Sequence, residues 1–580
     1  MAACITRLRC AEVAGMRWAW SLVAALVGGL LHGYAGPARA AQPELAAIIL
    51  LSAPEQQLPA GSARVGVDVT RVQAPASLRL SARLSELLGL PIERGNLDRL
   101  RATISDHYRS EGLPFVDVGL PGQDVTEGVV QLVVTEYRVG AIRVEGNAWY
   151  ADAYILNHAA LQSGSFIDKP ALDRRITQLS AGPYLSVVPE FSPGATRGTT
   201  DLVLRATDRM PLQLTAGFGN TGSAATGWER WSLGASWGNG LRAGHTLDWR
   251  ISSSSELLRS HHSQEEEREP SFLSHMLGWR IPLSSGDAIQ LTASHARINP
   301  RLGGDLRSRG LNIEFGAFYQ LQLPPSPLAL FPGARQDLGI GYEFKRSNND
   351  LSFGGEIVQR GFSDVSQLVL RYTLVSGGAE ALTTLQSTAV LSPGGMTPAN
   401  DDVDFQPSGF DRSGLPGARA RYAYSRTSLT RQIQLSEHLG LVMRASGQIA
   451  SGTLLASEQL SIAGVDTVRG YREFGRAGSH GVVLGGELRG PPLALLSRFG
   501  QGLPEDTLKP HAFLDAGHGW NPVASSAAPA RQRTASFGIG AQYDIGRGLS
   551  FRLEQGWQLA RDQSRGADGA FLHVAMTAVW

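Results

Sequence analysis

Alternation of apolar and polar side chains is the feature that most limits how this chain can fold, and it runs from about residue 208 to the C-terminus. In one such segment every second residue is apolar, namely Trp231, Leu233, Ala235 and Trp237. Residues 247–252 and 441–449 repeat the pattern. A period of two places one set of side chains on each face of a β-strand. Because Arg230, Asp248 and Arg250 share the polar face, the pattern predicts a closed transmembrane β-barrel with a wet, charged lumen.

A soluble β-sandwich would alternate in the same way and is the alternative fold. Charged side chains on the inner face of successive strands favour the barrel, as do the Trp, Tyr and Phe residues near strand ends, where lipid headgroups would lie. About 370 residues, at roughly 20–25 residues per strand and connection, allow about 16 antiparallel strands, although roughly 14 or 18 would also fit.

Residues 1–40 have the features of a secretory signal peptide. The apolar run Trp18–Leu31 follows three arginines, and residues 38–40 form a small-x-small cleavage site. A membrane anchor is the alternative, but the apolar run is too short for one. Both cysteines, Cys4 and Cys10, lie in this segment, so the mature chain lacks the residues for a disulfide, a thiolate metal site or a cysteine nucleophile. The formal net charge of +1 gives no support for nucleic-acid binding.

Residues 41–63 join this segment to the first folded domain. The apolar residues Leu45–Leu51 are followed by a proline-containing stretch, residues 54–59, that is typical of a linker. We expect residues 41–63 to be a linker, and they are a candidate plug for the pore.

Two α+β units follow, at residues 64–136 and 137–207. In the first, Val65, Val67 and Val69 alternate as a strand, two helical apolar faces come next, and two further strands close the unit. The second unit repeats the order strand, helix, helix, strand, strand. Small sheets of this kind leave edges at which an extended peptide can add a strand, unless the edges are merely solvated.

The stretch Leu455–Gly490 combines strand-like ends with a glycine-rich centre. The tetrapeptide Val468-Arg469-Gly470-Tyr471 lies in this centre. Because Gly470 lets the backbone turn where a side chain would clash, the preceding arginine can reach deep into a cavity. We therefore expect a structured loop, at about residues 463–480, inside a barrel formed by residues 208–580.

These residues resemble the sixth-loop motif, Val-Arg-Gly-Tyr or Val-Arg-Gly-Phe, of the BamA/TpsB superfamily of outer-membrane barrels. The flanks SEQLSIAG, residues 457–464, and GGELRGP, residues 485–491, are similar to the TpsB branch, the two-partner secretion transporters of the ShlB/FhaC/HecB haemolysin secretion/activation type. The two α+β units resemble POTRA domains. Overall the resemblance covers roughly residues 64–580.

The segment His511–Gly517, reading HAFLDAG, carries a second match. Its alternation turns Phe513, Asp515 and Gly517 inward. In TpsB relatives the loop arginine pairs with the aspartate of a motif of this kind, so the resemblance makes Asp515 the lumen partner of Arg469. Arginine suits this role because its planar fork can bind a carboxylate through two hydrogen bonds. A solvated lumen charge is the alternative for Asp515.

Both ends of the predicted barrel carry further matches. Residues 218–228 resemble the family's first-strand motif, with Gly219 where relatives usually have Asp. The chain ends in alternating apolar residues and Trp580. This ending resembles the C-terminal signal that the outer-membrane assembly machinery recognises, although relatives more often end in Phe.

Two patterns that could suggest chemistry have simpler explanations. Residues 234–238 fit the G-x-S-x-G nucleophile elbow, but that motif needs a strand, a sharp turn and a helix, whereas Ser236 lies within an alternating strand. His261, His262 and Glu265–Glu267 lie on a polar loop, where convergence on one metal ion would be accidental. We therefore expect no catalytic residue, metal or cofactor.

The resemblance implies a bacterial outer-membrane transporter with two periplasmic POTRA domains and a barrel of about 16 antiparallel strands. It would not be an enzyme. It would export a TpsA-type adhesin or haemolysin that the POTRA domains capture unfolded and that threads through the barrel. The expected partners are this secreted client, outer-membrane lipid and the barrel assembly machinery, and no nucleic acid. The alternatives are a BamA-like assembly factor, a barrel-embedded hydrolase and a passive porin.

Overall fold

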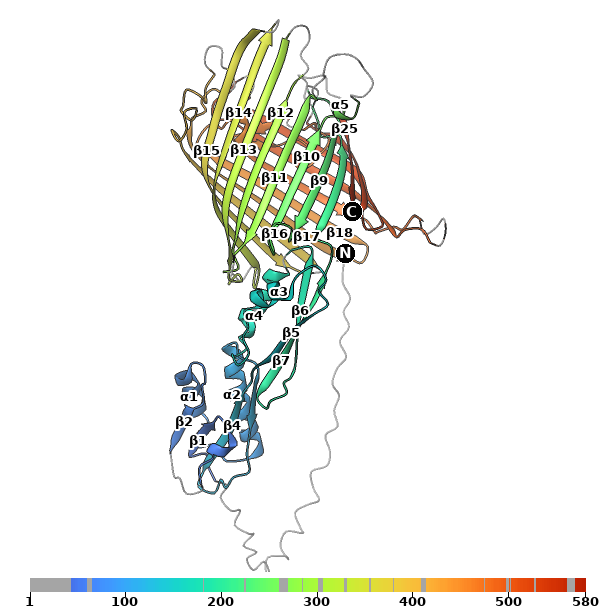
Figure 1. The fold of residues 1–580 in the computed structure, drawn as a ribbon. Helices are drawn as coiled ribbons and strands as arrows, with labels where there is room; N and C mark the ends of the chain where they lie inside the picture. The colour runs from blue at the N-terminus through green and yellow to red at the C-terminus, as the bar shows by residue number, and fades with distance from the viewer. Residues whose placement is uncertain are drawn as a thin grey trace, which may run out of the picture. The chain divides into compact units, whose positions relative to one another are not determined.

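The computed structural model describes residues 43–580 with short gaps (Figure 1). The gaps are residues 60–64, 181, 224–225, 260–269, 284, 301–305, 328–330, 354–355, 379, 408–413, 474, 497–499, 501, 526–527 and 561–568. The predicted signal peptide and the histidine- and glutamate-rich loop segment lie outside the described residues. The chain divides into two compact units, residues 1–137 and 138–580, and each is described by itself.

The first unit is an α+β domain with a four-stranded sheet in the order β2-β1-β4-β3. Its elements are β1 (Ala47–Leu51), η1 (Pro54–Gln56), β2 (Gly66–Arg71), α1 (Ser77–Ser85), α2 (Arg94–Ser110), β3 (Val116–Gly119) and β4 (Val129–Glu136). Apolar positions three and four apart place Leu80 and Leu84 of α1 and Leu100 and Ile104 of α2 in one core against the sheet. Tyr108 completes this core and donates a 2.5 Å hydrogen bond to Glu136.

The expectation that residues 41–63 form a linker or a pore plug is wrong for the described part of that segment. β1 is an inner strand that pairs in parallel with β2 on one side and β4 on the other. All five of its residues are buried, because Ile48 and Leu50 point toward the helices and Ile49 and Leu51 toward the other face. A strand buried on both faces is uniformly apolar rather than alternating, so its sequence lacks the period of two.

The second α+β domain has a three-stranded sheet in the order β5-β7-β6, with β5 parallel to β7. Its elements are β5 (Arg138–Glu145), α3 (Asp152–Ala159), α4 (Lys169–Leu179), β6 (Leu185–Pro193) and β7 (Thr199–Asp208). Asp168 caps α4 by accepting a 2.9 Å hydrogen bond from the Ala171 N–H. The order strand, helix, helix, strand, strand is the predicted one.

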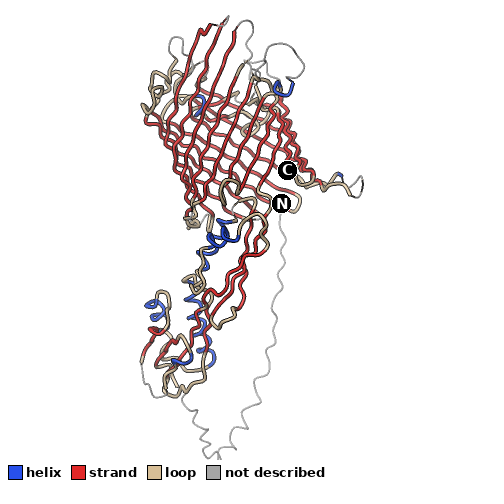
Figure 2. Tube along the Cα trace, in the orientation of Figure 1, coloured by secondary structure: helices blue, strands red, loops and turns tan. Residues whose placement is uncertain are grey.

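Sixteen antiparallel strands form a closed barrel, as the alternation predicts (Figure 2). In chain order they are β8 (Leu212–Gly219), β9 (Arg230–Gly238), β10 (Thr246–Ser253), β11 (Phe272–Pro282), β12 (Ala288–Ile298), β13 (Leu306–Leu323), β14 (Arg335–Phe353), β15 (Glu356–Gly377), β16 (Ala381–Pro393), β17 (Arg421–Ser436), β18 (Leu439–Ala450), β21 (His480–Arg489), β22 (Asp506–Trp520), β23 (Arg531–Ile545), β24 (Leu549–Gln558) and β25 (Ala570–Val579). A one-turn helix, α5 (Glu256–Arg259), follows β10. Ser236 lies inside β9, which β10 follows.

The barrel closes where β25 pairs with β8. This seam contains five residue pairs, from Thr215 with Val579 to Gly219 with Ala575. Trp580 extends it, since its N–H donates to the Leu214 carbonyl at 2.9 Å and its carbonyl accepts from the Leu214 N–H at 3.1 Å. The side chain of Asn220 extends the other end by accepting from the Val574 N–H at 2.9 Å.

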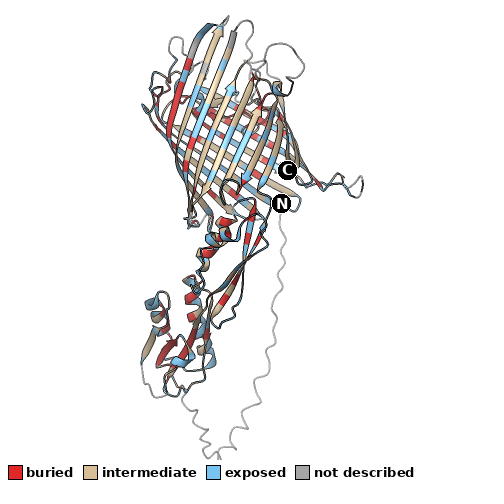
Figure 3. Ribbon diagram, viewed as in Figure 1, coloured by how far each residue is buried: buried red, intermediate tan, exposed pale blue. Residues whose placement is uncertain are grey.

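The strands turn large apolar side chains outward, and Figure 3 shows exposed and buried positions side by side along them. Outward residues include Leu233, Trp249, Ile449, Leu514 and Ile539, which are 42–70% exposed. Among the described residues, no helix is long and apolar enough to cross a membrane.

Candidate functional site: a loop anchored inside the barrel

The predicted loop connects β18 to β21 and folds back into the lumen. Residues 451–479 contain the 3₁₀ turn η2 (Ala456–Glu458) and a short hairpin of β19 (Leu460–Ser461) and β20 (Ala477–Gly478). Beyond the hairpin, Val468 and Arg469 are fully buried and Tyr471 is 5% exposed. An arginine with no exposed surface needs charged partners, because a lone buried charge is strongly unfavourable.

Arg469 finds three carboxylates on three strands, which we call the tip socket: Asp515, Glu487 and Glu554. Asp515 of β22 accepts from Nε at 2.7 Å, from Nη2 at 3.1 Å and from the Arg469 backbone N–H at 3.2 Å. Nη1 donates to Glu487 of β21 at 2.6 Å and to Glu554 of β24 at 2.8 Å. The guanidinium fork therefore joins three strands of the wall through one side chain.

Further side chains contact the carboxylates of the tip socket. Arg489 Nε lies 2.8 Å from Glu487, and Arg552 Nη2 lies 2.9 Å from Glu554. Arg444 Nη2 lies 4.0 Å from Asp515. His511 Nε2 lies 3.0 Å from Glu554. The tip socket and its neighbours thus combine three buried carboxylates with the buried Arg469 and three partly exposed arginines.

Gly470 fits against the backbone of the wall. Its φ of +85° is strained for any residue with a side chain. A Cβ on Gly470 would lie 3.0 Å from the Gly556 carbonyl carbon, and a Cβ on Gly556 would lie 2.5 Å from the Gly470 Cα. The Gly470 N–H donates to His573 Nε2 at 3.1 Å, and its carbonyl accepts from Gln558 Nε2 at 2.7 Å. Two glycines thus allow backbone to touch backbone at the deepest point of the loop.

The other predicted motif residues surround the arginine. The Phe513 ring lies under the guanidinium, with its centroid 3.7 Å from Arg469 Cζ. Gly517 leaves room for Val468, since a Cβ there would lie 3.1 Å from Val468 Cγ2. The Tyr471 hydroxyl donates to the Ala560 carbonyl, just after β24, at 2.7 Å and lies 2.9 Å from the carbonyl of Ala535 within β23.

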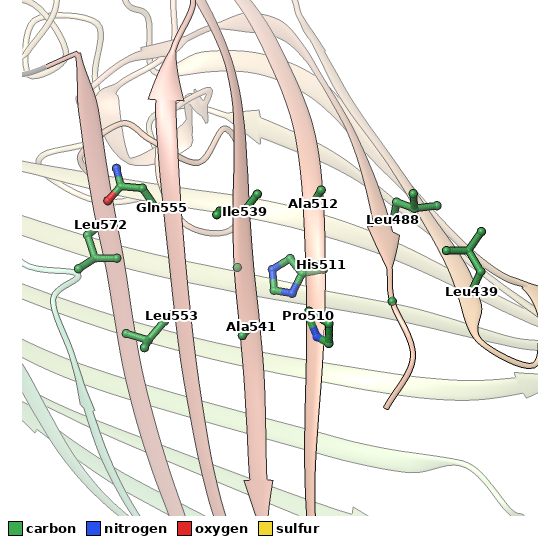
Figure 4. Close-up of a pocket in the computed structure, with 12 residues that line it drawn as sticks. Leu439, Leu488, Pro510, His511, Ala512, Ile539, Ala541, Leu553, Gln555 and Leu572 are labelled. Atoms are coloured by element: carbon green, nitrogen blue, oxygen red, sulfur yellow. The ribbon is translucent and has the colours of Figure 1, made fainter. Parts of the chain in front are cut away.

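The structure thus brings the predicted loop and strand residues together and leaves Trp580 apart, at the seam. Sequence reasoning missed Glu487, Glu554 and His573. Each lies at an inward position, as the outward neighbours Leu488, Leu553 and Leu572 show. These leucines line an apolar depression on the outer face of β21–β25 (Figure 4). Carboxylates on an inward face were the available signal, but nothing in the sequence says which strands meet the loop.

Glu487, His511 and Glu554 also have the geometry of a metal site, since their ligand atoms lie within 4.8 Å of one another. Arg469 Nη1 lies within 2.8 Å of both carboxylates and so takes the position that a cation would hold. Arg489 and Arg552 add further positive charge. While the loop is docked, repulsion from these arginines disfavours a divalent ion.

Comparisons with known proteins agree with this architecture. The family model "Haemolysin secretion/activation protein ShlB/FhaC/HecB" matches residues 337–543, and "POTRA domain, ShlB-type" matches residues 65–136. The heme/hemopexin transporter protein HuxB of Haemophilus influenzae (strain 86-028NP) is 20% identical over 67% of this chain and 65% of its own length. The outer membrane transporter CdiB of Dickeya dadantii (strain 3937) is 23% identical over 68% of this chain and 66% of its own.

The chain therefore spans just under two thirds of the length of these curated relatives. Among solved structures, CdiB from Escherichia coli superimposes with a TM-score of 0.70, covering 95% of this chain and 93% of that one at 16% identity. At this identity the likeness concerns the fold.

Proposed function

The chain belongs to the ShlB/FhaC/HecB haemolysin secretion/activation family, and from this premise we propose that it exports a partner protein of the TpsA type across the bacterial outer membrane. The observation that carries the proposal is the loop folded into the lumen of a closed barrel. Barrels of this strand number leave an aqueous channel. A channel that holds a folded loop can pass an extended chain once the loop moves aside.

The domains have distinct places in this proposal. Residues 1–40 direct export and are removed. The first and second α+β domains act as POTRA domains in the periplasm, and residues 208–580 span the membrane. Trp580 serves as the assembly signal during insertion by the barrel assembly machinery, and the outward leucines contact lipid.

The α+β domains are the elements that capture the client. The first sheet ends in the edge strands β2 and β3, and the second in β5 and β6. An unfolded client segment can pair with such an edge through main-chain hydrogen bonds, which requires little sequence specificity. The client then enters the barrel, and its folding outside the cell biases the movement outward.

Export can be tested by co-expressing this chain with a candidate TpsA-type protein, sought among the genes beside its own, in a host that lacks a transporter of this family. The partner should appear in the medium only when this chain is present. Deleting residues 43–207 should abolish export while leaving the barrel inserted. Equal release without this chain would contradict the proposal, and a general loss of other outer-membrane barrels on depletion would favour a BamA-like assembly factor.

Capture can be tested separately with purified residues 43–207, which include the buried strand β1. We expect them to bind the unfolded N-terminal domain of the partner at about micromolar strength, or about −8 kcal/mol. A calorimetric titration without heat, with both proteins shown to be intact, would remove the capture role.

A further inference from the structure

The base of the loop has its own anchor, eleven residues before Arg469 in the sequence. Glu458 is 1% exposed. Its Oε1 lies 2.9 Å from Lys345 Nζ on β14, and its Oε2 accepts from the Tyr424 hydroxyl on β17 at 2.9 Å and from Gln367 Nε2 on β15 at 3.3 Å. We call Lys345, Tyr424 and Gln367 the base anchor.

Side chains of the barrel wall also bind the backbone carbonyls at the base of the loop. The Glu458 carbonyl accepts from Arg426 Nη2 and from Gln448 Nε2, both at 3.0 Å. Arg426 also reaches the Gln459 carbonyl at 3.3 Å. A buried backbone segment with this many side-chain donors is fixed by the wall rather than by its own secondary structure.

The two anchors use different arcs of the barrel. Glu458 binds β14, β15 and β17, whereas the tip binds β21, β22 and β24. No strand belongs to both of these sets of side-chain partners, and β18, which lies between them in the barrel order, contacts the Glu458 carbonyl through Gln448 and Asp515 through Arg444. The loop therefore runs across the lumen from one arc of the wall to the other.

A second loop, residues 394–420, packs onto the base of the first. Phe405 is fully buried in a cluster with Tyr422, Leu454 and Leu455. Ala418 forms a bridge with Thr453, and the Ala399 carbonyl accepts from the Asp364 N–H at 2.9 Å. The described residues of this loop, 394–407 and 414–420, are therefore packed against the barrel and the sixth loop.

We propose that the Glu458–Lys345 ion pair is a second, independent catch that holds the sixth loop across the lumen and keeps the pore closed. Residues 43–59 belong to the first α+β domain and its sheet, so they could fill the pore only by leaving that core. The loop is the element already inside the lumen. Opening the pore then requires release at Glu458 as well as at Arg469, whether or not the chain exports a client.

Removing one partner of the Glu458–Lys345 pair leaves the other as a buried charge without its main counter-charge. In Lys345→Met, Glu458 and Glu343 remain as neighbouring carboxylates, because Glu343 Oε2 lies 3.8 Å from the removed Nζ. In Glu458→Gln, Lys345 keeps Glu343 as a partner. Lys345→Met should therefore release the loop base more than Glu458→Gln does.

Conductance of the purified full-length protein in planar bilayers tests the proposal without any client. Lys345→Met should raise the open fraction by at least about tenfold, which corresponds to about 1.4 kcal/mol. The double variant Lys345→Met/Glu458→Gln should open less often than Lys345→Met, because the stranded carboxylate is gone, whereas Lys345→Met/Arg469→Ala should exceed either single change. Arg335→Met is the matched control, since Arg335 lies on the same strand, pairs with the partly exposed Asp337 at 3.0 Å and is not part of the base anchor.

A crosslink between positions 345 and 458 tests whether increased conductance comes from the lost ion pair or from a general packing defect. The mature chain is predicted to contain no cysteine, so Lys345→Cys/Glu458→Cys can be joined by a short bis-methanethiosulfonate reagent, which forms a reducible disulfide with each thiol and releases methanesulfinate. The variant should conduct before crosslinking, close afterwards and reopen on reduction. Wild-type conductance of Lys345→Met in a folded, heat-modifiable barrel would overturn the proposal, and so would a crosslinked variant that stays open.

Discussion

Replacing Arg469 with alanine should undock the tip of the sixth loop, and the tip socket predicts by how much. Without the guanidinium, Glu487 keeps Arg489 at 2.8 Å and Glu554 keeps Arg552 at 2.9 Å. Within the described part of the chain Asp515 keeps only Arg444 as a charged partner, whose Nη2 lies 4.0 Å away and 3.7 Å from Glu487. The uncompensated charge therefore falls mainly on Asp515. A buried charge that loses its partner costs about 3–5 kcal/mol, which would shift the docking equilibrium roughly 10²- to 10⁴-fold.

The variants at Asp515 should not mirror those at Arg469. In Asp515→Asn the guanidinium retains Glu487 and Glu554, so the loss should be smaller, about 1–3 kcal/mol. In the double variant the stranded carboxylate is gone. Arg469→Ala/Asp515→Asn should therefore dock better than Arg469→Ala alone, and the two effects should be non-additive. A simple one-to-one pair would instead predict equal losses from the two single changes.

Thiol labelling reports the docked fraction directly. Ala463 lies in the loop and is 1% exposed, so Ala463→Cys should react with a maleimide only when the loop undocks. We expect labelling to accelerate most in Arg469→Ala, less in the double variant and least in Asp515→Asn. Heat-modifiable mobility of each protein is the control for folding. Equal labelling rates with and without Arg469, or a loss in Asp515→Asn as large as in Arg469→Ala, would refute the assignment of three carboxylates to one guanidinium.

Three further outcomes follow from the structure. Gly556→Ala should undock the loop as strongly as a charge deletion, because its Cβ would lie 2.5 Å from the Gly470 Cα, whereas Gly486→Ala, with no atom within 4 Å of its Cβ, should label at the wild-type rate. Leu50→Ala should destabilise the first α+β domain by about 2–5 kcal/mol, seen as faster limited proteolysis, without changing the conductance of the barrel. A rise in conductance would instead support the hypothesis that residues 41–63 plug the pore. Ser236→Ala should leave any hydrolase activity of a purified sample unchanged, because the serine lies within β9 and not at an elbow; loss of activity would favour the embedded hydrolase.

The barrel was predictable from sequence because its constraint is repeated in every strand. Lipid requires each backbone group to be paired within the sheet and each outward side chain to be apolar, so a period of two recurs over the whole domain. The strand β1 was not predictable in this way. A parallel inner strand is apolar on both faces, and its partners depend on chain connections that no local pattern encodes.

The candidate site likewise contains residues that the sequence could predict and residues that it could not. Arg469 and Gly470 were recognisable because a compact motif carries both the charge and the turn. Glu554 and His573 lie 85 and 103 residues from the loop residues they bind, on strands that approach the loop only once the barrel has closed. Phe405 lies in a segment rich in glycine and proline that carries no periodicity, and only the packed structure shows the apolar cluster that it completes.

The depth of the loop is set by backbone contact rather than by charge. An ion pair tolerates small shifts, since Arg444 still interacts with Asp515 at 4.0 Å, and its energy changes slowly with distance. The contact between Gly470 and Gly556 does not tolerate such shifts, because a methyl group on Gly556 would lie only 2.5 Å from the Gly470 Cα. The carboxylates therefore supply the attraction and the glycines determine where the loop stops. A variant that keeps every charge but adds a methyl group at residue 556 should hold Arg469 too far from the wall to bind Asp515, Glu487 and Glu554 together, and so should lose docking without losing an ionisable group.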